Sequence, residues 1–94
     1  MAPANEYQLN DFNSEARPPQ SIAFYEKHQD GTESGGTTLE EMLRVSVARL
    51  KELNSRFACR ENSLAVTKME EALLWLNART ADRIARGVEG KHVL

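Results

Sequence analysis

The stretch from Thr38 to Leu53, TLEEMLRVSVARLKEL, decides the fold class. Thr38 and Glu41 form a capping box, in which the Thr hydroxyl and the Glu carboxylate each accept a hydrogen bond from a backbone N–H. Apolar residues then recur at steps of three and four, which is the spacing of one helix face. The pattern predicts a first helix over about residues 38–53, with a buried face made of Leu39, Met42, Leu43, Val47, Leu50 and Leu53.

A longer second helix is expected to follow. Asn54 and Ser55 interrupt the apolar pattern, and residues 58–86 then run without Gly or Pro until Gly87, a residue type favoured just after a helix end. At 1.5 Å per residue the two helices would be about 24 Å and about 43 Å long. The first helix would then leave part of the second uncovered, which predicts self-association through the exposed residues Leu73, Leu74, Trp75 and Leu76.

Residues 1–36 are polar and contain all three prolines, which is typical of an extended arm. Within the arm only Ser21 to Tyr25 has the composition of a short β-strand. Three glycines near the end of the arm are interpreted as a flexible joint, because no strand precedes them and no Gly-Lys-Ser/Thr follows, as a phosphate loop would require. These glycines are Gly31, Gly35 and Gly36.

The predicted fold class is therefore mainly α. It is an antiparallel two-helix hairpin with a long C-terminal helix and an extended N-terminal arm, assembled into an oligomer. Residues 1–36 would form the arm, and residues 37–94 the hairpin domain that carries oligomerisation and ligand binding. A chain of 94 residues buries a modest core, so help from a partner chain is plausible.

Composition narrows the function classes. The single cysteine, Cys59, cannot form an internal disulfide, and no apolar run approaches the roughly 18 residues needed to span a bilayer. The first residues, MAPANEYQLND, lack the charged-then-apolar pattern of a signal peptide. These features predict a cytoplasmic protein without a membrane partner.

The charge is distributed unevenly along the chain. The net charge of −2 argues against a simple electrostatic DNA binder. Residues 1–43 carry two Lys/Arg against eight Asp/Glu, net −6, whereas residues 44–94 carry ten against six, net +4. An anionic ligand is therefore expected to bind the second half of the chain.

One stripe of the second helix changes from apolar to cationic. Arg79 and Arg83 are like charges four residues apart, and an anion between them would remove the cost of that pair. Guanidinium groups also offer paired donors to a phosphate. The alternative is structural: basic residues near a helix C-terminus complement its dipole, and Asp82 can pair with Arg79 or Arg86. Steps of three and four define the stripe as Asn62, Ala65, Met69, Ala72, Leu76, Arg79, Arg83 and Arg86.

Other chemistry-bearing residues favour structural roles. Cys59 has no histidine at a spacing that would activate it, and packing is favoured over base stacking for Trp75. Neither His28 nor His92 has the Cys/His spacing of a zinc site. The adjacent carboxylates at residues 70–71 point to different sides of a helix and are expected to be solvated. No metal, cofactor or catalytic residue is predicted, and a small phosphodiesterase is disfavoured.

The second helix also carries several separated motifs in order. Residues 57–73 read FACRENSLAVTKMEEAL, and Trp75-Leu76 is followed by Arg79-Thr80, Asp82-Arg83 and the segment from Ala85 to Gly90. This set resembles a helical-hairpin family of phage proteins that includes the anti-CBASS protein two and the C-terminal part of the Thoeris anti-defence protein one. The resemblance covers about residues 57–92.

The resemblance implies a sponge for signals made by infected bacteria. Such a protein sequesters a cyclic oligonucleotide or a cyclic ADP-ribose signal without degrading it, in pockets between the subunits of a homo-oligomer. By family resemblance the oligomer is a hexamer. Asn62, Arg79 and Arg83 best match ligand-binding positions, with the arginines on phosphates and Asn62 on a base or ribose. The wider candidate set adds Arg86, Arg60 and Lys68.

The arm departs from the family, because Glu26-Lys27-His28 stands where relatives have a Gly-Pro turn. Phe24, Tyr25 and Lys27 could supply a stacking ring or a phosphate contact, and docking of Phe24 into a core is equally consistent with the sequence. A second class of function also remains open. A helical oligomer could act as an adaptor that binds another protein, with the arginines in interface salt bridges.

Overall fold

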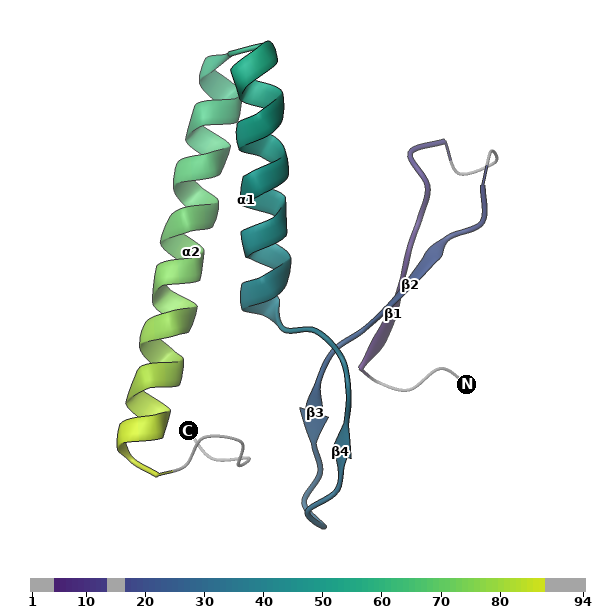
Figure 1. The fold of residues 1–94 in the computed structure, drawn as a ribbon, viewed down its shortest axis with the longest axis vertical. Helices are drawn as coiled ribbons and strands as arrows, with labels where there is room; N and C mark the ends of the chain where they lie inside the picture. Colours follow the sequence, from purple (N-terminus) through teal and green to yellow (C-terminus); the bar gives the residue numbers. More distant parts are fainter. Residues whose placement is uncertain (1–4, 14–16, 88–94) are drawn as a thin grey trace. The chain divides into compact units, whose positions relative to one another are not determined.

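The computed structural model describes residues 5–13 and 17–87. The chain divides into two compact units, residues 1–38 and residues 39–94. Two small antiparallel strand pairs belong to the first unit and two helices to the second (Figure 1). The protein is therefore mainly helical with N-terminal strands.

Helix α1 (Leu39–Arg56) begins directly after Thr38, where the capping pattern predicts a start. Glu40 and Glu41 occupy its first turn, where carboxylates complement the helix dipole. The Nε atom of Arg44 donates to Glu41 at 2.8 Å, an ion pair one turn along the same helix. Local charge thus supports the start of α1.

Two asparagine side chains hold the connection between the helices. Asn54 accepts from the backbone N–H of Cys59 at 3.1 Å and donates to the Ser63 hydroxyl at 3.2 Å. The side-chain amide of Asn62 donates to the Phe57 carbonyl oxygen at 3.5 Å. The sequence pattern predicted that the first helix ends before Asn54, which is wrong because α1 continues to Arg56. Asn54 lies in the last helical turns and closes the connection from there.

Helix α2 (Arg60–Ala85) starts after Cys59, whose sulfur accepts from the Asn62 backbone N–H at 3.4 Å. At the other end Arg86 is the C-cap, and its N–H donates to the Asp82 carbonyl oxygen at 3.0 Å. Gly87 follows with φ +72°, a left-handed conformation that glycine adopts without strain. The prediction of Gly87 as the residue after the helix is confirmed.

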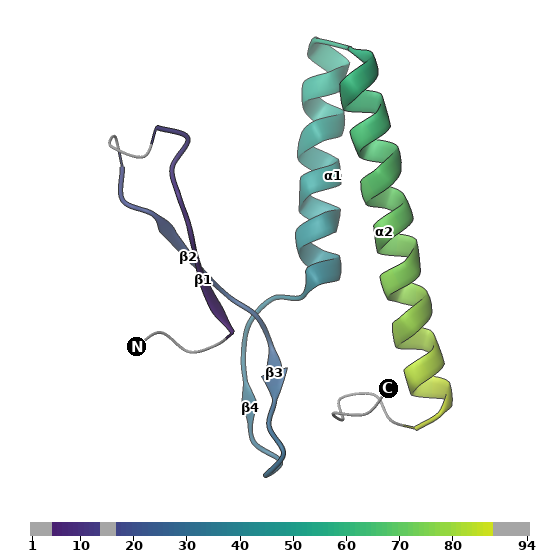
Figure 2. The ribbon, with the colours of Figure 1, turned by 180° about the vertical axis from the view of Figure 1, so that it is seen from behind.

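The helices run antiparallel and side by side (Figures 1 and 2). Val47 on α1 and Val66 on α2 form the core among the described residues, each 8% exposed. On α2 the less exposed residues follow alternating steps of four and three, the 3.5-residue repeat of a helix–helix seam. They are Asn62, Val66, Met69, Leu73, Leu76, Thr80 and Arg83.

This seam corrects the stripe predicted from sequence. The prediction took a step of three from Asn62 to Ala65, whereas the structure takes a step of four to Val66. The observed register buries valine and leucine in place of alanine, and so removes more apolar surface from water. The residues displaced to the exposed flank are Ala65, Ala72, Arg79 and Arg86.

The longer helix extends beyond the shorter one. With 26 residues against 18, α2 exceeds α1 by eight residues, or about 12 Å of helix (Figure 1). Leu74 and Trp75 are 67% and 68% exposed, as predicted for an uncovered segment. Leu73 and Leu76 were predicted to be uncovered as well, which is wrong because both lie half-buried at seam positions. The expected packing of Trp75 is likewise absent from the described hairpin.

The N-terminal unit contains four short strands where an extended arm with one strand was predicted. β1 (Glu6–Leu9) pairs antiparallel with β2 (Gln20–Ala23), and β3 (Glu26–Lys27) pairs antiparallel with β4 (Glu33–Ser34) (Figure 2). The strand predicted over residues 21–25 overlaps β2, but its pairing partner was not anticipated.

A close backbone contact ties the ends of these strand pairs together. The N–H of Thr37 donates to the Ala23 carbonyl at 2.9 Å, and its carbonyl accepts from the Tyr25 N–H at 2.8 Å. A Cβ on Gly36 would lie 2.5 Å from the Ala23 oxygen and 2.6 Å from the Phe24 carbonyl carbon. Gly36 therefore permits a close approach, which differs from the flexible joint predicted for it.

Candidate functional site

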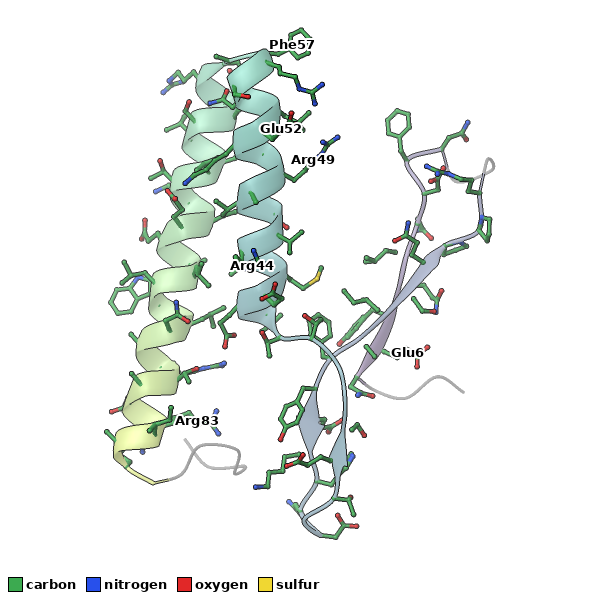
Figure 3. All side chains as sticks on the ribbon, viewed as in Figure 1. Glu6, Arg44, Arg49, Glu52, Phe57 and Arg83 are labelled. Atoms are coloured by element: carbon green, nitrogen blue, oxygen red, sulfur yellow. The ribbon has the colours of Figure 1, made fainter. Side chains whose placement is uncertain are left out.

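Arg79 and Arg83 lie in the C-terminal turns of α2 and Arg86 is its C-cap; Figure 3 labels Arg83. Arg83 is half-buried at a seam position, and its Nε atom is buried. Arg86 donates from Nε to Asp82 at 2.9 Å, one of the two pairings that the structural alternative predicted. Arg79 is exposed and makes no hydrogen bond or ion pair with the part of the chain that the structure describes. Its guanidinium is thus the one best placed to receive an anion.

The spacing of Arg79 and Arg83 suits a phosphate. Residues four apart lie on adjacent turns of one helix side, with Cβ atoms about 6 Å from each other. Long guanidinium side chains from such positions can both donate to one phosphate, and charge-assisted hydrogen bonds of this kind are the strong ones. The arrangement therefore suits the binding of an anion.

Asn62 lies at the opposite end of α2. It is 17 residues from Arg79, which corresponds to about 26 Å along the helix. One chain therefore cannot bring both side chains to the same small ligand. Asn62 also stabilises the connection between the helices, because its side-chain amide donates to the carbonyl oxygen of Phe57. The phenyl ring of Phe57, labelled in Figure 3, is exposed.

Arg60 and Lys68 are exposed on the N-terminal half of α2. Arg60 is the first residue of the helix, and the Nζ of Lys68 lies 4.0 Å from Glu71. Both are nearer to Asn62 than to Arg79 along the helix. The structure therefore separates the predicted binding residues of α2 into two groups, one at each end.

The remaining candidates belong to the N-terminal unit. The Phe24 ring is half-buried and meets Tyr7 edge to face, with centroids 5.7 Å apart, so the docking alternative describes it better than a free stacking ring. Desolvation raises the pKa of Tyr25, and the charge of Glu33 and a hydrogen bond to it add to the rise. Lys27 is half-buried in β3, opposite Glu33 in the strand register.

Other titratable side chains have structural partners. Glu70, expected to be only solvated, pairs with Lys51 across the hairpin at 2.9 Å, and the ring of His28 hydrogen-bonds the Ser34 hydroxyl at 2.8 Å. No group of three His, Cys, Asp or Glu side chains in the described ranges could hold a metal ion, and His92 lies outside them. Within the same ranges no helix has the length and apolarity to cross a membrane.

The sequence did not reveal a shallow, open groove of about 290 Å³ on α2. The observed seam pattern of alternating four- and three-residue steps could have indicated this groove, because it places Leu73 at the edge of the seam with Leu74 beside it. The groove contains a carboxylate and no cation, so it is poorly suited to an anionic ligand. Its lining residues are Glu70, Leu73, Leu74 and Asn77.

Similarity to known proteins covers both the strands and the helices. A family model described as Acb2/Tad1, hairpin domain, matches residues 8–81. The protein Thoeris anti-defense 1 of Bacillus phage SBSphiJ7 is 53% identical over 64 residues, which make up 65% of this chain and 45% of that protein. The chain thus spans less than half the length of this curated relative. The family resemblance inferred from residues 57–92 is confirmed.

Proposed function

The chain belongs to the Acb2/Tad1 hairpin-domain family, and we propose on this basis that it is a phage anti-defence protein that sequesters a cyclic nucleotide immune signal. The signal is a cyclic di- or trinucleotide of the CBASS type or a cyclic ADP-ribose of the Thoeris type. The protein acts by titration: it binds the signal tightly, does not cleave it, and so lowers the concentration that reaches the host effector.

The cationic end of α2 carries the proposal. Arg79 presents a guanidinium without a partner among the described residues, and Arg83 follows one turn later. Arg79 and Arg83 are like charges four residues apart, and a phosphate that accepts hydrogen bonds from both would relieve their repulsion. Arg86 is a further candidate next to them, although its pair with Asp82 compensates much of its charge.

The binding pocket is proposed to lie between copies of the chain. Because about 26 Å of helix separates Asn62 from Arg79, the copy that supplies the arginines cannot also supply Asn62 to the same ligand. In the proposed homo-oligomer, a second copy places Asn62 against a base or ribose, and Arg60 and Lys68 enter the pocket with it. Tyr25 and Lys27 remain candidates for further contacts.

Calorimetry with a panel of cyclic nucleotides tests this function. We expect binding of at least one of cyclic di-AMP, cyclic tri-AMP and cyclic ADP-ribose. The double variant Arg79→Ala, Arg83→Ala should bind at least about 100-fold more weakly, since each charge-assisted hydrogen bond contributes roughly 1.5–3 kcal/mol. Arg49→Ala is the matched control, because it removes an exposed arginine of α1 that lies 3.4 Å from Glu52.

Recovery of the bound nucleotide separates sequestration from catalysis. Heat denaturation of the loaded protein should release the signal intact, as chromatography against the starting compound would show. Undiminished affinity of the arginine double variant, or recovery of a cleaved nucleotide, would contradict the proposal.

A protein-binding adaptor is the second candidate. Its support is the apolar surface of α2, where Leu74, Trp75 and Ile84 are 67%, 68% and 61% exposed. Thermal unfolding separates the two functions: a ligand bound at 100 times its dissociation constant stabilises the native state by about 2.7 kcal/mol. The absence of any shift with the whole nucleotide panel would favour the adaptor.

A further inference from the structure

Trp75 lies on the face of α2 that points away from α1. Successive residues of an α-helix are rotated by about 100°, so the seam positions Leu73 and Leu76 place the indole on the outward side. The Trp75 side chain is 68% exposed, and it makes no hydrogen bond or ring contact with the residues that the structure describes. The hairpin therefore leaves its largest aromatic ring in solvent.

Arg79 follows Trp75 by one helical turn on the same face, and the Cβ atoms of the two residues lie about 6 Å apart. The carboxylates nearest to Arg79 along α2 already pair with other cations. Glu71 lies 4.0 Å from Lys68, and Asp82 accepts from Arg86 at 2.9 Å. The positive charge beside the indole is thus uncompensated within the described chain.

A ring and an unpaired guanidinium one turn apart suit a ligand that presents a base and a phosphate together. The base can stack on the indole, and the guanidinium can donate two parallel hydrogen bonds to the phosphate. A purely apolar partner would remove Arg79 from water without pairing its charge, which is unfavourable. We propose that Trp75 and Arg79 form one subsite, in which Trp75 stacks on a nucleobase of the bound signal and Arg79 holds the adjacent phosphate. This inference rests on the proposed function.

A second copy of the chain is the competing occupant of the indole. In a parallel association along this face, Arg79 of one copy would approach Arg79 of the other, and like charges oppose such a contact. A different flank of α2 is apolar and uncharged, and it can take a copy-to-copy contact that leaves the indole open. It is formed by Leu74, Ala78, Ala81 and Ala85.

Because Trp75 is the only tryptophan of the chain, its fluorescence reports on this position alone. The full chain is titrated with cyclic tri-AMP and separately with cyclic ADP-ribose, and heat and tryptophan emission are both recorded. We expect quenching that saturates at the same ligand concentration as the heat. Trp75→Leu should weaken binding about 5- to 100-fold, and Trp75→Phe should stay within about 3-fold of the wild type because a ring is kept.

Leu64→Ala is the matched control. Leu64 is 45% exposed on the outward side of α2, eleven residues and about 16 Å before Trp75, so its truncation should leave the affinity unchanged. Arg79→Lys keeps the charge but loses the planar fork, and should bind more weakly than the wild type while still quenching the emission.

The outcomes separate the subsite from the function on which it rests. Heat of binding without a change in emission, or wild-type affinity of Trp75→Leu, would overturn the subsite and leave sequestration standing. Blue-shifted emission that resists acrylamide in the ligand-free protein would also overturn it, because a second copy would then cover the indole. No heat with any probe would contradict the proposed function and the subsite together.

Discussion

Gly36 shows how one residue can determine the path of the N-terminal unit. The Ala23 oxygen and the Tyr25 nitrogen would lie 2.5 Å and 2.8 Å from a Cβ at this position, closer than folded proteins allow. We predict that Gly36→Ala destabilises the strand pairs by about 1–3 kcal/mol, because the backbone at Thr37 must move away. Amide hydrogen exchange at Tyr25 and Thr37 measures the loss.

Gly35→Ala is the control for this prediction. A Cβ on Gly35 meets nothing within 4 Å, so the variant should exchange its amides like the wild type. Equal protection in the Gly36 and Gly35 variants would show that the close backbone approach is not what constrains the unit.

Tyr25 provides a pH-dependent prediction at the same scale. Its pKa is raised by desolvation and by Glu33, so the native state holds the phenolic proton more tightly than the unfolded state does. The associated stability is complete below the unfolded pKa of 10.0 and is lost as pH rises through the higher folded pKa. Absorbance of tyrosinate in a Tyr7→Phe background should show ionisation of Tyr25 at higher pH in native protein than in urea.

Two substitutions test the cause of that shift. Glu33→Gln should move the titration of Tyr25 toward lower pH, because the neighbouring negative charge is removed while desolvation remains. Glu26→Gln, which removes a half-buried carboxylate of β3, should have no such effect. An identical titration of Tyr25 in the wild type and in Glu33→Gln would contradict the assignment.

At the scale of elements, the stability of the hairpin depends on which residues form the seam. Val47 is 8% exposed and Val45, two residues earlier on α1, is 50% exposed. We predict that Val47→Ala lowers the free energy of unfolding by about 1–2 kcal/mol, the cost of losing two buried methyl groups. Val45→Ala should change it by less than about 0.5 kcal/mol, partly because alanine favours helix. Urea denaturation of the two variants gives both values.

Local chemistry explains why the helices could be predicted and the strands could not. The Thr38–Glu41 capping pattern and the glycine at residue 87 are signals within a few residues of the helix ends. The apolar steps between them repeat often enough to show a helix. β1 has four residues, of which three are exposed, so it has no buried face that a pattern could reveal. It becomes a strand by pairing with β2, and such a long-range pairing has no local signal.

The candidate site, like the fold, was predicted only in part from the sequence. The arginines were found because four-residue spacing of like charge is visible in a sequence. The register was wrong by one step, since Ala65 and Val66 are both apolar and only packing against α1 selects between them. The pairing of Asp82 with Arg86 rather than Arg79 depends on side-chain conformation, and the sequence left both pairings open.

At the scale of the whole molecule, the separation between the two ends of α2 is the main constraint on function. Asn62 and Arg79 lie about 26 Å apart along one helix, a long distance for one small ligand to bridge. If both contact the same ligand, they come from different copies, and the pocket exists only in the assembly. In such an oligomer, two variants that each lack one side of the pocket can together form an intact binding site.

This leads to a complementation prediction. Asn62→Ala alone and Arg79→Ala, Arg83→Ala alone should each bind cyclic tri-AMP or cyclic ADP-ribose weakly, because every pocket lacks one side. Mixed oligomers, prepared by unfolding and refolding the two variants together, should recover tight binding in about a quarter of their pockets, namely those that receive an intact Asn62 and intact arginines by random assembly. Calorimetric stoichiometry measures this fraction. If no tight sites appear at any mixing ratio although each variant keeps the wild-type oligomeric mass, the ligand is held by a single chain and the shared pocket is wrong.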